Sequence, residues 1–153
     1  MSFSLDTSSL IWAWRFAYPR PNFPTLWQRF EALIRDGEMR ASSMVLAELE
    51  RIEDELLEWA KARGDLLVEL DRPQQESVRG MLADFPGLVP AGQDRINADP
   101  FVIALAIRDG SSVISQERRS GNPATPMIPN VCAARDVECV NFVEFIARQG
   151  WVF

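Results

Sequence analysis

Short apolar segments alternate along this chain with longer segments in which apolar residues recur at helical spacing. We interpret the short segments as strands, and they lie at residues 3–5, 66–70, 111–115, 137–140 and, at one edge, 151–153. The segments of helical periodicity lie at residues 10–16, 26–34, 43–62, 74–85, 101–108 and 142–148. Because strands that alternate with helices pair in parallel through right-handed crossovers, we expect an α/β fold with a mainly parallel central sheet.

Length and composition limit the number of domains that the chain can form. The chain has 153 residues, of which 47% are hydrophobic, which is enough for one core and too little for two ordinary domains. We therefore expect a single domain over residues 1–153. No apolar run reaches the roughly 18 residues that a membrane-spanning helix needs, and the N-terminal segment lacks the pattern of an export signal. These features predict a cytoplasmic protein with no membrane partner.

The charged and reactive residues exclude several kinds of chemistry. The sequence contains 0 histidines and 2 cysteines, so zinc sites of thiolate and imidazole ligands and mechanisms that use a histidine base are excluded. A formal net charge of -6 argues against broad affinity for nucleic acid, because phosphate contacts need lysine and arginine. Chemistry based on carboxylates and a metal ion is what these exclusions leave.

The segment 43–62 has the most regular helical pattern in the chain. Its apolar residues recur at alternating spacings of four and three, namely Val45, Leu49, Ile52, Leu56 and Trp59, and Ser43 suits the N-cap position. At about 100° per residue, Glu48 lies about 60° from the middle of the apolar stripe, whereas Glu50 and Asp54 point away from it. Glu48 is therefore the acid that we expect to face inward.

Four carboxylates stand at or near the ends of predicted elements and are far apart in sequence: Asp6, Glu48, Asp99 and Glu117. Ligands of parallel sheets bind beyond the carboxyl ends of the strands, which is where Asp6 and Glu117 fall. Four carboxylates that meet in space need a hard divalent cation such as Mg²⁺ or Mn²⁺ to offset their repulsion. The pattern therefore suggests a metal site.

Each of these acids also has a structural interpretation. Asp99 precedes a proline and suits a helix N-cap, while Asp6 can satisfy amides in the turn that follows it. Glu48 can lie on a solvated helix face, and a carboxylate such as Glu117 is ordinary at the start of a loop. Taken singly, none of the four decides between a structural and a metal-binding role.

Three further residues are candidates for contacts with a substrate. Arg118 and Arg119 follow Glu117 directly, in a segment, 116–127, that is rich in proline and glycine and that we interpret as a loop. These arginines could attract phosphate groups, or they could simply be solvated. Ser8 lies in the turn after the first predicted strand and could touch a phosphate oxygen.

Four short motifs, in this order, resemble the PIN domain. They are Asp-Thr-Ser-Ser-Leu from Asp6, Val-Leu-Ala-Glu-Leu from Val45, Ala-Asp-Pro-Phe-Val-Ile-Ala-Leu-Ala from Ala98, and Val-Ile-Ser-Gln-Glu from Val113. More narrowly, the chain is similar to the VapC-like ribonucleases of prokaryotic toxin–antitoxin pairs. The resemblance implies a three-layer α/β/α sandwich and a metal-dependent endoribonuclease that hydrolyses RNA phosphodiesters.

The resemblance also implies roles for the four acids. Asp6 would be the central ligand of Mg²⁺ or Mn²⁺, and Asp99 and Glu117 would complete the metal shell, although the family more often has aspartate at the last position. Glu48 would bind the metal through water or orient the nucleophile. A cognate antitoxin protein and a homodimer are the partners that the family implies.

Two other functions stay open at this point. A PIN-like module could have kept the fold while serving only to bind a protein, with its acids retained as structure. A related metal-dependent enzyme could act on DNA or as a phosphatase, since recognition of the ribose 2′-hydroxyl leaves no sequence motif.

Overall fold

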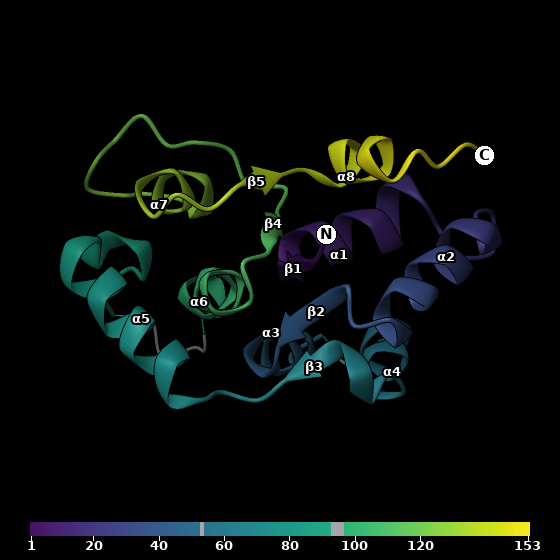
Figure 1. Ribbon diagram of the computed structural model, residues 1–153, viewed down its shortest axis with the longest axis horizontal. Helices are drawn as coiled ribbons and strands as arrows, with labels where there is room; N and C mark the ends of the chain where they lie inside the picture. Colours follow the sequence, from purple (N-terminus) through teal and green to yellow (C-terminus); the bar gives the residue numbers. More distant parts are fainter. Residues whose placement is uncertain (53, 93–96) are drawn as a thin grey trace.

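A five-stranded sheet with every strand pair parallel forms the centre of the computed structural model, which describes residues 1–52, 54–92 and 97–153 (Figure 1). The strand order is β3-β2-β1-β4-β5. The strands are β1 (Phe3–Leu5), β2 (Met39–Ser42), β3 (Leu67–Val68), β4 (Ser112–Ile114) and β5 (Cys139–Val140). The predicted parallel α/β fold is therefore confirmed, with β1 at the centre of the sheet.

Helices cover both faces of this sheet. They are α1 (Thr7–Trp12), α2 (Pro24–Arg35), α3 (Ser43–Leu49), α4 (Glu55–Lys61), α5 (Arg72–Asp84), α6 (Asp99–Asp109), α7 (Ile128–Ala134) and α8 (Phe142–Gln149). A π-helical turn, Ala13–Ala17, extends α1, and two 3-10 turns lie at Gly64–Leu66 and Pro86–Leu88. In Figure 1, α5, α6 and α7 lie to the left of the sheet and α1, α2 and α8 to its right, which gives the three layers. Within the described residues, no helix is long and apolar enough to cross a bilayer.

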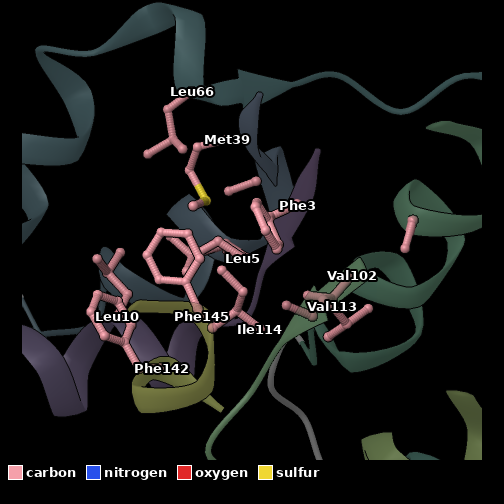
Figure 2. Packing of buried hydrophobic residues seen from close by; sticks show 14 of the residues in the cluster. Phe3, Leu5, Leu10, Met39, Leu66, Val102, Val113, Ile114, Phe142 and Phe145 are labelled. Carbon is pink, nitrogen blue, oxygen red and sulfur yellow. The ribbon is translucent and has the colours of Figure 1, made fainter. Parts of the chain in front are cut away.

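Aromatic and aliphatic side chains pack against both faces of the central strands (Figure 2). Phe3 of β1 meets Phe145 of α8 edge to face, with 5.0 Å between the ring centroids. On α6, Val102 is fully buried, and its carbonyl accepts a 2.8 Å hydrogen bond from the hydroxyl of Ser4 in β1. This packing holds β1 against α6 and α8, and it therefore fixes the position of Asp6, the residue that follows β1.

The long helix expected over residues 43–62 is interrupted. The first part, α3, ends at Leu49 and α4 begins at Glu55, while residue 53 lies outside the described residues. Asp54 caps α4 by accepting hydrogen bonds from two backbone amides of its first turn. The spacing of apolar residues by three and four does not reveal such a break, because a second helix that begins at a new cap can bury the same apolar face as the first.

Two expectations about strands were wrong. The strand β2 was not predicted, although it pairs with β1 through Phe3 and Met39 and with β3 through Ala41 and Leu67. Its sequence, Met-Arg-Ala-Ser, has no β-branched residue, so propensity gives no signal there. Conversely, residues 151–153 form no strand, and Trp151 instead packs its ring against Phe145 of the core.

Candidate functional site

The four predicted carboxylates come from four separate elements and converge at the carboxyl ends of the central strands. Asp6 directly follows β1, and its backbone N–H donates to the carbonyl of Ile114 in β4 at 2.9 Å. Glu48 lies on α3, which follows β2 without a loop, and Glu117 lies three residues beyond β4. Asp99 is the first residue of α6. The charges of the other three acids all raise the pKa of Asp99, so the structure brings the four together.

Asp6 lies at the buried centre of the cluster, with 2% of its surface exposed. The hydroxyls of Ser8 and Ser115 both donate to its Oδ2, the latter at 2.8 Å, and the amides of Thr7 and Ser8 also donate to its carboxylate. Burial raises the pKa of Asp6 above its ordinary value, and these hydrogen bonds offset part of that shift. These donors hold the carboxylate in one orientation.

Glu48 faces the cluster, as its place on the helical pattern predicts. Its Oε1 accepts a 2.7 Å hydrogen bond from the hydroxyl of Thr7, and the backbone N–H of Ala98 donates to the same carboxylate. The pKa of Glu48 is raised, mainly by burial and also by the charge of Asp6. The side chain therefore links the turn after β1 to the start of α6.

Asp99 and Glu117 form a hydrogen-bonded carboxyl pair. Burial first, and then the charges of Asp6, Glu117 and Glu48, raise the pKa of Asp99 to about 8. The pKa of Glu117 is also raised, by burial and like charge, while the backbone N–H of Ile128 donates to its Oε2 at 3.0 Å and lowers it. The pair therefore shares a proton at neutral pH. Asp99 is not the side-chain N-cap that its sequence context allowed.

A cleft of about 830 Å³ opens beside three of these acids. Glu48, Asp99 and Glu117 line it together with parts of the segments 86–91 and 124–127. Pro86 and Pro90 of the first segment and Pro126 of the second are among its lining residues. The carboxylates are thus open to a molecule that enters from solvent.

The structure also places the three substrate-contact candidates. The hydroxyl of Ser8 donates to Asp6 and accepts from the backbone N–H of Gln116 at 3.2 Å, so it belongs to the support of the cluster. Arg118 and Arg119 are exposed and are not among the residues that line the cleft. Within the described ranges, neither forms an ion pair. Both side chains are exposed to solvent in the segment that directly follows Glu117.

Sequence reasoning missed three groups that hold the acids in place. Thr7 and Ser115 supply hydroxyl donors to Glu48 and Asp6, and each lies within a motif that was recognised. A hydroxyl within two residues of a predicted carboxylate is the signal that could have identified them. The N–H of Ile128 is a backbone group, so no side-chain pattern could have indicated it.

The donor set suits a hard divalent cation in its chemistry, since all four groups supply carboxylate oxygens. Within the described residues, no three histidine, cysteine, aspartate or glutamate side chains stand as a formed metal site. Their oxygens accept hydrogen bonds from hydroxyls and amides or share a proton, as described above. The type and the number of these side chains therefore suit a divalent cation. For all four carboxylates to coordinate one cation, their side chains would have to change orientation.

A comparison with models of protein families assigns the chain to one family. The model described as "Domain of unknown function (DUF4411)" matches residues 3–153. The chain belongs to this family. None of the curated proteins matches its sequence.

Solved structures show the fold of this DUF4411 chain to be PIN-like. One is VapBC2 from Rickettsia felis bound to a promoter DNA fragment, with a TM-score of 0.53 and 14% identity over 92% of this chain and 98% of that chain. Another is FitAcB from Neisseria gonorrhoeae, with a TM-score of 0.52 and 18% identity over 91% and 96% of the two chains. At such identities the similarity concerns the fold.

Replacing Asp99 by asparagine will change how the stability of the metal-free protein depends on pH. Because the pKa of Asp99 is raised on folding to about 8, the folded state binds more protons than the unfolded state between about pH 4 and pH 8, and wild-type stability falls as pH rises through this window. Asparagine does not titrate. The free energy of unfolding of Asp99→Asn, relative to wild type, should therefore increase by roughly 1–3 kcal/mol from pH 4 to pH 8.

The measurement is urea denaturation with EDTA at several pH values. Asp36→Asn, on the exposed turn after α2, is the matched control and should differ from wild type by a constant amount. A difference between Asp99→Asn and wild type that does not vary with pH would mean that neither burial nor the charges of the other acids raise the pKa of Asp99.

Proposed function

We propose that this protein is a divalent-metal-dependent endoribonuclease and the toxin of a toxin–antitoxin pair. The observation that carries the proposal is the convergence of four carboxylates from four elements, three of them lining a cleft, with raised pKa values caused by burial and by one another. Such mutual repulsion is costly unless a cation or a proton offsets it. A hard divalent cation is the partner that would let all four ionise.

Bound Mg²⁺ or Mn²⁺ supplies a water made acidic near neutral pH and stabilises negative charge on a leaving oxygen. Asp6, whose orientation its hydroxyl and amide donors fix, would be the central ligand. Asp99 would give up the proton that it shares with Glu117, so that both carboxylates become ligands. Glu48, which Thr7 and the amide of Ala98 hold in place, would orient the attacking water.

A phosphodiester chain suits the cleft and its surroundings. The segments 86–91 and 124–127 flank the carboxylates, which leaves room for a strand of nucleic acid above them. Arg118 and Arg119 are exposed directly after Glu117, where they would attract backbone phosphates toward an otherwise acidic protein. Ser8 would contribute through its hydrogen bond to Asp6 rather than by direct contact with the substrate.

The structural neighbours support a protein partner. One of them is VapBC2 bound to a promoter DNA fragment, and a further solved structure with a similar fold is FitAB bound to the IR36 DNA fragment. We infer that this chain likewise has a cognate antitoxin, and that it pairs with a second copy of itself. Because VapBC2 and FitAB are bound to DNA in these structures, the substrate assay must include DNA as well as RNA.

Neutralising one acid at the centre of the cluster should abolish cleavage. Asp6→Asn removes the proposed central ligand, while the hydroxyls of Ser8 and Ser115 can turn to accept from the new amide and so preserve the fold. We expect wild type to cut a structured RNA pool with Mg²⁺ or Mn²⁺ and not with EDTA, and Asp6→Asn to be slower by at least about 100-fold. Asp36→Asn should cleave like wild type.

The same assay separates the other functions. Cleavage of single-stranded DNA but not RNA would replace the ribonuclease with a DNA nuclease. Metal-dependent cleavage that Asp6→Asn leaves unchanged would remove the cluster from the mechanism. A wild-type protein that cuts neither polymer but binds a protein partner equally well with either residue at position 6 would be a binding module.

Removing the two exposed arginines should weaken RNA binding and reduce its dependence on salt. We expect the Arg118→Ala/Arg119→Ala double variant to lower the slope of log affinity against log salt by about 1–2, because each lost phosphate contact releases about one counterion fewer. The measurement is fluorescence anisotropy of a labelled RNA from 50 to about 200 mM salt. Arg29→Ala/Arg35→Ala, on the exposed face of α2, removes equal charge and should leave the slope unchanged.

A further inference from the structure

The loop between Glu117 and α7 is closed at its base by one amide side chain. Asn130 Oδ1 accepts hydrogen bonds from the backbone N–H of Ser120 at 2.8 Å and from that of Met127 at 3.0 Å. Its Nδ2 donates to the carbonyl of Ser120 at 3.0 Å. These three hydrogen bonds join two points seven residues apart, so a segment that the sequence indicates only as a loop has a fixed beginning and end.

The same side chain organises the first turn of α7. Asn130 is the third residue of that helix and bonds back to the N–H of Met127, the residue before the helix, in the manner of a capping box. The next backbone N–H along the chain, that of Ile128, donates to Glu117 Oε2 at 3.0 Å. The peptide that holds Glu117 is therefore adjacent to the one that Asn130 holds.

The loop is also fixed at its far side, where it forms a wall of the cleft. A Cβ atom on Gly87 would lie 1.9 Å from the carbonyl oxygen of Ala124 and 3.2 Å from the side chain of Pro126. Such distances mean that the two backbones touch at Gly87, and no larger residue fits there unless the loop moves. The loop is thus held between Asn130 and Gly87, with Glu117 at its start.

We propose that Asn130 is a positioning residue for Glu117. It fixes the turn at residues 127–128, and that turn presents the Ile128 N–H to one oxygen of the Glu117 carboxylate and leaves the other oxygen for the cluster. The proposal deepens the proposed nuclease function, because it assigns the group that orients the fourth acid. It concerns the metal-free protein as well, so it can be tested whether or not the protein cleaves RNA.

The test is hydrogen exchange of individual amides, measured by NMR on the full chain with EDTA. Asn130→Ala should speed exchange at Ile128 by about tenfold, the effect of losing one capping interaction on local opening. Asn141→Ala is the matched control, because Asn141 caps α8 through the N–H and the carboxylate of Glu144. It should speed exchange in the first turn of α8 and leave Ile128 within about twofold of wild type.

A double-variant cycle separates positioning from a simple helix cap. Glu117→Ala should also speed exchange at Ile128 by about tenfold, since it removes the acceptor of that N–H. If Asn130 acts by presenting the N–H to Glu117, adding Asn130→Ala to Glu117→Ala should produce little further change. A double variant about 100-fold faster than wild type would mean that the two residues act independently, and this result, or unchanged exchange in Asn130→Ala alone, would overturn the proposal.

Cleavage kinetics add a second criterion. Asn130→Ala should lower kcat by about tenfold, as expected when a ligand side chain loses its orientation, while Asn141→Ala should keep wild-type kcat. A full wild-type kcat in Asn130→Ala would overturn the positioning role. If wild type cuts neither RNA nor DNA, the proposed function fails, and the exchange cycle alone still decides the role of Asn130.

Discussion

Repulsion among four half-buried or buried carboxylates is the interaction on which the rest of this site depends. Asp6 is almost fully enclosed, and its charge raises the pKa of each of the other three acids, Glu48, Asp99 and Glu117. A protein has no structural reason to collect such groups, because each added charge makes the others costlier to ionise. The proton that Asp99 and Glu117 share relieves the repulsion, and a divalent cation would relieve it more completely. We propose that the site exchanges this proton for a divalent cation.

The fold positions these charges through the geometry of its sheet. Asp6 leaves the central strand, and its N–H extends the pairing of β1 with β4, which brings the start of the Glu117 loop beside it. Hydroxyl groups then donate hydrogen bonds to the acids, that of Ser115 to Asp6 and that of Thr7 to Glu48. The core beneath, where aromatic rings of α8 pack on β1, keeps this arrangement rigid (Figure 2). Support of this kind fixes the direction of each carboxylate before any ligand binds.

Much of this arrangement could be predicted because it depends on local patterns. The alternation of strands and helices indicated the parallel sheet, and the helical period indicated that Glu48 faces inward. What could not be predicted depends on contacts between distant segments. The strand Met39–Ser42 is defined by its two neighbours and not by its residues, and the break before Asp54 leaves the apolar period intact. The hydrogen bonds from the backbone amides of Ser120 and Met127 to Asn130 likewise form only once α7 has formed.

The proposed exchange of a proton for a cation can be tested directly by titrating Mn²⁺ into the protein near pH 7, with calorimetry in two buffers of different protonation enthalpy. The two apparent enthalpies give the number of protons that leave when the metal binds. If the carboxylate cluster is the metal site, binding should release about one proton, the one that Asp99 shares with Glu117, and Asp6→Asn should abolish the binding. Binding with no proton release, or binding that survives Asp6→Asn, would contradict the account.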